Sequence, residues 1–153
     1  MKALVLTLIL TAVLVLPAQA RLGETEDLLI NRYGGEISNQ WSNIGNGLWV
    51  KELIFKRTGF QIDVYLFNGF SAQENFTKLT QPAFSREEKQ TLLQANTQGH
   101  KWAIVPNSGP EWHRDDGAMA VDQGGYLVLT SKELIDAQTT AFKAANASSL
   151  EGF

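Results

Sequence analysis

The sequence has no cysteine, and among its 153 residues it has only four prolines and two histidines. Without cysteine, no disulfide braces the fold and no thiol serves as a nucleophile or metal ligand. The histidines, His100 and His113, have no further ligand at the spacings that zinc sites use. We therefore predict no metal site and no cofactor, and a fold that is held together by packing of apolar side chains.

The chain also lacks a basic run. Lys and Arg number 13 against 16 Asp and Glu, which gives a net charge of -3 at pH 7. Affinity for nucleic acid comes largely from phosphate neutralisation by Lys and Arg, so nucleic acid is not an expected partner. No serine lies in a Gly-x-Ser-x-Gly elbow, and no phosphate-binding loop is present.

The one long apolar run lies at the start of the chain, over residues 3–16, and follows Lys2. Pro17 ends it, and the small residues Ala18 and Ala20 come next, as in a signal peptidase site. The run is shorter than the roughly 20 residues that cross a membrane. We predict that residues 1–20 form a signal peptide, cleaved after Ala20. The remaining chain is then periplasmic or extracellular, with no stable membrane insertion.

Residues 21–153 are predicted to form a single α+β domain. A first unit, residues 21–80, begins with a helix over Glu26–Tyr33 that Thr25 caps, followed by a loop over residues 38–47. Apolar alternation predicts strands over residues 48–56, 60–67 and 70–79, and Asn68-Gly69 is a strong hairpin signal between the last two. These strands form a three-stranded antiparallel meander.

A second unit, residues 81–153, repeats this order. Ser85 and Glu88 form a capping box for a helix that reaches Ala95. Further predicted segments are strands over residues 101–105, 112–114, 118–121 and 126–130, and a C-terminal helix over residues 131–145, capped by Thr130 and Glu133, with fraying from residue 146 to 149. The pattern indicates a helix plus antiparallel meander, repeated twice. It leaves open whether the strands form one sheet or two.

Candidate binding residues come from the tryptophans and from one polar segment. Trp49 and Trp102 lie in apolar strands and are predicted to fill the core, whereas Trp41 and Trp112 have polar surroundings and suit a surface. Residues 111–117 collect reactive side chains, although Asp116-Gly117 is also an ordinary hairpin turn with solvated neighbours. The predicted binding residues are Trp41, Trp112, His113, Asp115 and Tyr126, and no catalytic residue is assigned.

Two functions from different classes remain open. The first is a non-enzymatic protein-binding module of the cell envelope or the secreted fraction, in which exposed aromatic residues contact a protein partner. The alternative is a hydrolase of cell-wall or glycan material that uses His113 or a pair of carboxylates as acid and base.

Several short motifs carry a resemblance that covers most of residues 21–153. They are Arg21-Leu22-Gly23-Glu24-Thr25, Arg32-Tyr33-Gly34, the hairpin over 59–69, the helix over 87–96 leading to Gly99-x-x-Trp102, Asp115-Asp116-Gly117, and Leu150-x-Gly152-Phe153. In these the chain resembles a group of uncharacterised small exported bacterial proteins. The resemblance implies export and a common fold, and it implies no activity.

A more distant resemblance rests on the Gly-Thr-led helix that precedes a β-meander. In this respect the chain is similar to outer-membrane assembly lipoproteins and to β-lactamase inhibitor proteins. It departs from them at Glu36, which follows Gly34-Gly35 where a proline is usual, and in the absence of a lipid-bearing cysteine. The resemblance therefore implies an architecture and does not imply an anchor in the outer membrane.

The predicted cleavage site gives the first test. Protein recovered from the exported fraction of expressing cells is expected to begin at Arg21 when its N-terminus is sequenced and its intact mass is measured. Replacing Ala18 and Ala20 by a bulky residue is expected to block cleavage, because signal peptidase needs small side chains there. An exported protein that still begins at Met1 would contradict the prediction.

Overall fold

A computed structural model describes residues 21–57, 59–80 and 83–150. For residues 148–150 it describes the main chain alone. The predicted signal peptide lies outside the described residues. The elements in chain order are α1 (Glu26–Tyr33), β1 (Ser38–Asn43), β2 (Trp49–Arg57), β3 (Phe60–Phe67), β4 (Phe70–Lys78), α2 (Arg86–Ala95), β5 (Trp102–Ile104), β6 (Glu111–Arg114), β7 (Met119–Asp122), β8 (Tyr126–Thr130) and α3 (Lys132–Leu150). The predicted α+β class, with helices and antiparallel meanders and a C-terminal helix, is confirmed.

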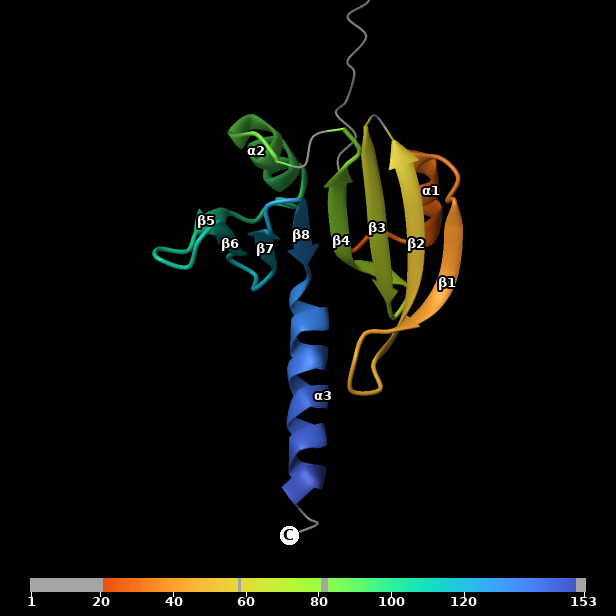
Figure 1. Ribbon diagram of the computed structural model, residues 1–153, viewed down its shortest axis with the longest axis vertical. Helices are drawn as coiled ribbons and strands as arrows, with labels where there is room; N and C mark the ends of the chain where they lie inside the picture. The colour runs from red at the N-terminus through yellow and green to blue at the C-terminus, as the bar shows by residue number, and fades with distance from the viewer. Residues whose placement is uncertain (1–20, 58, 81–82, 151–153) are drawn as a thin grey trace, which may run out of the picture.

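All eight strands join in one antiparallel sheet in the order β1-β2-β3-β4-β8-β7-β6-β5 (Figure 1). Each half of the sheet is one unit of a helix followed by four antiparallel strands. The halves meet where β4 pairs with β8, with Glu74 opposite Leu129 and Phe76 opposite Leu127. Of the two arrangements that the sequence left open, the single sheet is the one observed. The first strand of each unit becomes an outer edge of the sheet.

The hairpin between β3 and β4 turns where the sequence predicts it. Asn68 and Gly69 have φ angles of 53° and 85°. A two-residue turn of this kind needs positive φ at both positions, which Asn and Gly tolerate best. This turn fixes the register of β3 against β4 near the hairpin, where Phe67 lies opposite Phe70.

The main core lies on the face of the sheet that α1 and α2 cover. Leu29 of α1 and Leu93 of α2 are buried in the same cluster as inward-facing residues of both halves. The buried strand residues of this cluster are Leu53, Phe55, Ile62, Val64, Leu66, Phe76, Ala120, Leu127 and Leu129. Burial of these apolar side chains from water is the main favourable contribution that the sheet makes to folding.

The opposite face carries a smaller cluster, in which Leu134 of α3 packs with Val50 and Ala72. Beyond this first contact α3 runs past the sheet (Figure 1), and Phe142 is 57% exposed. Within the described residues, no helix combines the length and the apolar character needed to cross a membrane.

Strand β1 corrects the prediction for the first unit. Residues 38–47 are predicted to be a loop, but Ser38–Asn43 pairs with β2 along its whole length, so the meander has four strands and not three. The strand escapes pattern analysis because its residues are almost all polar. Half-buried strands are found by apolar alternation, and an outer strand with little burial lacks that signal.

The helix ends confirm one predicted cap and correct two others. Ser85 Oγ accepts from the Glu88 amide at 3.2 Å and Glu88 returns to the Ser85 amide at 2.7 Å, as a capping box requires. Thr25 precedes α1, but its side chain makes no capping bond. The cap of α3 is Ser131 and not Thr130, because Ser131 Oγ accepts from the Leu134 amide at 3.3 Å.

Two further predictions are wrong. Helix α3 does not fray at residue 146 but continues to Leu150. Trp49, predicted to fill the core, is 57% exposed, because it is the first residue of β2 and lies opposite Asn43, the last residue of the outer strand β1. Trp102 does pack against the main core, as predicted.

A glutamate is buried at the junction of the two halves. Glu74 of β4 lies between Val64 of β3 and Leu129 of β8, with none of its surface exposed. Its carboxylate accepts hydrogen bonds from Ser71 Oγ at 2.8 Å and from Tyr33 Oη at 3.3 Å. Burial raises the pKa of Glu74 to about 7, because desolvation of the charged form outweighs these bonds.

This burial predicts a pH-dependent stability. The folded pKa exceeds the unfolded one, so the folded state holds an extra proton between about pH 4.5 and 7, and the free energy of unfolding falls as pH rises through that window. Glu74→Gln is expected to remove this dependence, so that its free energy of unfolding rises relative to that of wild type by roughly 2–3 kcal/mol between pH 5 and pH 8. Urea denaturation at both pH values measures it. Glu87→Gln, at an exposed position of α2, is the matched control; equal pH slopes in wild type and Glu74→Gln would contradict the prediction.

Candidate functional site

A groove of about 1170 Å³ lies between α2 and the strands β5 and β6. We call it the α2 groove. One wall is formed by α2, whose lining side chains are mostly uncharged and include Glu87, and the other by aromatic and aliphatic side chains of the outer strands. The α2 groove is lined by Glu87, Gln90, Thr91, Leu93, Gln94, Ala95, Thr97, Gly99, His100, Lys101, Trp102, Ile104 and Trp112.

The sheet wall presents two indole rings and an isoleucine. Register places Ile104 of β5 directly opposite Trp112 of β6, and Trp102 lies two residues before Ile104, so all three side chains share the face that α2 covers. Both indoles are half-buried against the core, whereas Ile104 is 62% exposed. Trp102 Nε1 is the one buried side-chain polar atom without a hydrogen-bond partner among the described residues.

Each indole ring has a cation near its centroid. The Arg114 guanidinium lies 5.5 Å from the centroid of the Trp102 ring, and Lys89 Nζ lies 6.0 Å from that of Trp112. Lys89 also pairs with Asp122 at 2.9 Å. Cation–π contacts of this kind stabilise by about 0.5–2 kcal/mol and restrict ring orientation. The aromatic wall is therefore fixed before any ligand arrives.

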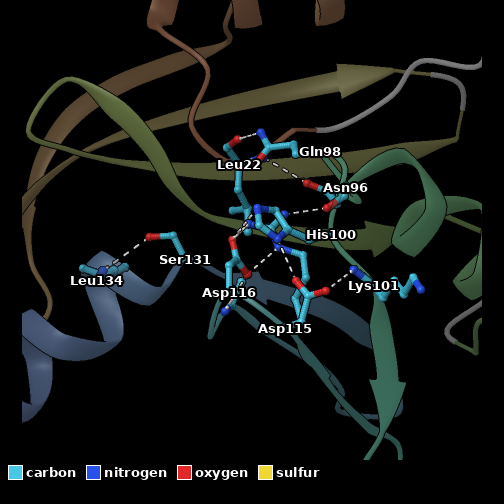
Figure 2. A network of polar contacts seen from close by, with 11 residues as sticks. Leu22, Asn96, Gln98, His100, Lys101, Asp115, Asp116, Ser131 and Leu134 are labelled. Atoms are coloured by element: carbon cyan, nitrogen blue, oxygen red, sulfur yellow. Dashed lines mark hydrogen bonds and ion pairs between the residues drawn. The ribbon is translucent and has the colours of Figure 1, made fainter.

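A polar network surrounds Asn96 and Asp116 (Figure 2), and the buried Arg114 joins these two residues. Its Nε and Nη2 donate to the two carboxylate oxygens of Asp116 at 2.8 and 2.6 Å, and its Nη1 donates to the Asn96 main-chain oxygen at 2.5 Å. The bonds from Arg114 lower the pKa of Asp116. Because Asn96 ends α2 and Arg114 ends β6, this network fixes the helix against the strands and sets the position of the groove.

The same network ties down the start of the described chain. The Leu22 amide donates to Asn96 Oδ1 at 2.9 Å, and Gln98 Nε2 donates to the Leu22 carbonyl (Figure 2). A smaller hollow of about 450 Å³ lies beside this segment, and its walls include Ser71, Arg114 and Glu133. Two of the charged side chains in its wall, Arg114 and Asp116, form an ion pair with each other.

His100 and Asp115 form an exposed pair at the rim, with 2.6 Å between Nδ1 and Oδ1 (Figure 2). His100 Nε2 lies 3.8 Å from Asp116 Oδ2. These three side chains each place one possible metal ligand within 4.8 Å of the others. Both Asp116 oxygens already bond to Arg114 and Asp115 bonds to His100, so hydrogen bonds within the protein account for the cluster.

The five predicted binding residues do not converge. Trp112 lines the α2 groove and Asp115 lies at its rim, but Trp41 is on the outer strand at the other end of the sheet. His113 pairs with Glu111 at 2.6 Å, and it and Tyr126 lie on strand positions that alternate with those facing α2. The structure thus brings Trp112 and Asp115 together and places the other three residues elsewhere.

Sequence reasoning missed the residues that organise the site. His100 and Asp115 are 15 residues apart, and only the pairing of β5 with β6 brings them together. In the sequence Arg114 is only a strand residue, although an arginine followed two residues later by an aspartate at a turn is a possible bidentate pair. Ile104 carried no signal, because a single aliphatic residue in a short strand is normally buried.

The fold and groove define a class: an α+β protein of two helix-plus-meander units fused into one eight-stranded sheet, with an aromatic groove at one end. No protein family, no curated protein and no solved structure matches the chain.

The network predicts that Arg114 is needed for stability. Arg114→Lys keeps the charge but cannot make the two-pronged bond to Asp116 and also reach Asn96, so the free energy of unfolding is expected to fall by about 2 kcal/mol. Arg86→Lys, at an exposed position of α2, is the matched control and is expected to change nothing. Chemical denaturation compares the two; equal stabilities would show that the network carries little energy.

Proposed function

We propose that this chain is an exported, non-enzymatic protein-binding module, acting in the periplasm or outside the cell, and that the α2 groove is its docking site. The observation that carries the proposal is the fixed aromatic wall of Trp102 and Trp112 beside the exposed Ile104. Aromatic residues are over-represented among the side chains that dominate protein interfaces.

The dimensions and lining of the groove favour a protein segment over a small molecule. Its volume of about 1170 Å³ exceeds the usual range for small-ligand sites, and it is open to solvent along α2. The opposite wall carries Gln90, Thr91 and Gln94, which are exposed and uncharged. Amide and hydroxyl groups of this kind bond to a peptide main chain without selecting a charge. An extended segment with apolar side chains directed at Ile104 and Trp112 fits this lining.

The hydrolase alternative receives less support from the groove. His113 lies away from it, and the imidazole at its rim, His100, is already paired with Asp115. No serine belongs to the lining of the α2 groove, whose hydroxyl groups are those of Thr91 and Thr97. The lining thus supports contact with a partner more than acid–base chemistry.

The proposal predicts a partner whose capture depends on Ile104. In-cell crosslinking of the wild-type protein, followed by mass spectrometry, is expected to recover one exported or envelope protein in stoichiometric amount. Ile104→Glu is expected to reduce that recovery at least about tenfold, since it places a charge on the apolar wall of an interface. The exposed position of Ile104 leaves the fold intact.

Ala103→Glu is the matched control, because Ala103 is the exposed neighbour of Ile104 whose side chain points to the other face of the sheet. It is expected to recover the partner as well as wild type does. Equal recovery of the partner with both variants would show that the α2 groove is not the docking site. Absence of any stoichiometric partner other than the chain itself would count against the binding function as a whole.

A further inference from the structure

The two outer edges of the sheet differ in how they are protected. β5 is only three residues long and lies between Lys101 and Pro106. Short length, lysine and proline are the usual means by which proteins prevent an edge from pairing with another strand. The β5 edge is therefore blunted, and the α2 groove beside it acts through side chains.

The edge at β1 has none of these protections. β1 is six residues long, and no charged residue or proline occurs from residue 37 to 44. In Figure 1, no described element lies beyond β1. A long, uncharged and regular edge is a template for pairing with another strand.

Hydrogen-bond geometry shows which groups of β1 are free to pair. The Ile44 amide donates to the Leu48 carbonyl at 2.9 Å, so the main-chain groups of Ser38, Gln40 and Ser42 point toward β2 in the same alternation. The N–H and C=O groups of Asn39, Trp41 and Asn43 therefore point outward. Among the described residues, no other element bonds to them.

Two exposed indoles lie at this edge. Trp41 is directly opposite Lys51, whose ammonium pairs with Glu26 of α1 at 2.6 Å, so Trp41 lies on the face that α1 partly covers. Trp49 is its diagonal neighbour on β2, on the same face, because Asn43 is opposite Trp49. Trp41 is 68% exposed and Trp49 is 57% exposed. An uncovered tryptophan pair at an open edge indicates an interface.

We propose that the β1 edge is a homodimer interface, in which β1 of a second copy pairs antiparallel about a twofold axis through Trp41. In this register each Trp41 faces its counterpart, and Asn39 faces Asn43 of the second copy. The outward groups then exchange about six main-chain hydrogen bonds. A second copy is favoured over another protein because the edge is complementary to itself: asparagine flanks Trp41 symmetrically, and no charge meets a like charge.

The pairing also covers the exposed indoles. Trp41 and Trp49 of one copy would continue into Trp41 and Trp49 of the other, forming one aromatic row across the joined sheet. Aromatic cross-strand pairs stabilise antiparallel pairing, and burying the row removes apolar surface from water at both copies.

The first test measures mass in solution. The full chain is expressed and purified as the cell processes it, and sedimentation equilibrium over a concentration series is expected to show a monomer–dimer equilibrium. Trp41→Lys is expected to weaken the dimer at least about tenfold, because two lysines then face each other. Gln40→Lys is the matched control on the same strand, since its side chain lies on the other face, where Glu52 pairs with it.

Charge reversal separates a broken interface from a damaged fold. A mixture of Trp41→Lys and Trp41→Glu is expected to form heterodimers, because the introduced lysine of one copy then faces the introduced glutamate of the other, while each variant alone stays monomeric. Circular dichroism checks that both variants fold like wild type. A wild-type protein that is monomeric at every concentration, or a mixture that fails to associate while wild type dimerises, would overturn the proposal.

The absence of native cysteine allows a direct test of the register. In Trp41→Cys, the two sulfurs flank the twofold axis, with Cα atoms about 5.5 Å apart, and are expected to form a disulfide on mild oxidation. In Asn39→Cys, the same distance is about 14 Å, too far for a disulfide. Equal crosslinking of the two variants would show that the copies meet by chance collision and not in this register.

Discussion

The pairing of β4 with β8 is the interaction on which the rest of the structure depends. Each unit alone is a four-stranded sheet with one helix and would leave the inner edge of its last strand unpaired. Joining them makes both strands interior and places Phe76 and Leu127 opposite each other in one continuous core. The junction also explains why the domain needs no disulfide, since one larger core replaces two marginal ones.

Polar groups reinforce this junction at a cost. Glu74 lies within the joined sheet and loses its hydration there, which hydrogen bonds from Ser71 and Tyr33 partly offset. In the second unit, Arg114 donates to the Asn96 main-chain oxygen. The Oδ1 atom of Asn96 accepts from the Leu22 amide, which belongs to the first unit. Removing one member of such a network leaves its buried partners without hydrogen bonds, so each member is needed once the network is in place.

The sequence predicts most of the fold because its local signals agree with one another. The Asn68-Gly69 turn, the alternation in β3 and the Ser85 capping box each specify their own element, and all three are observed. β1 is missed because an edge strand buries too little to show a pattern. The candidate site was predicted only at Trp112 and at Asp115 on its rim, because its other parts come from α2 and β5 and meet through strand pairing that no local pattern encodes.

The two proposed surfaces lie at opposite ends of the sheet and do not compete. With strands about 4.8 Å apart, seven spacings separate β1 from β5 by about 34 Å. A dimer joined at β1 therefore carries its two α2 grooves at the outer ends, at most about 70 Å apart along the sheet. Such a molecule gains affinity by engaging two sites at once only where the target is repeated at that spacing. The proposed dimer thus favours a repeated or surface-bound target over a single soluble protein.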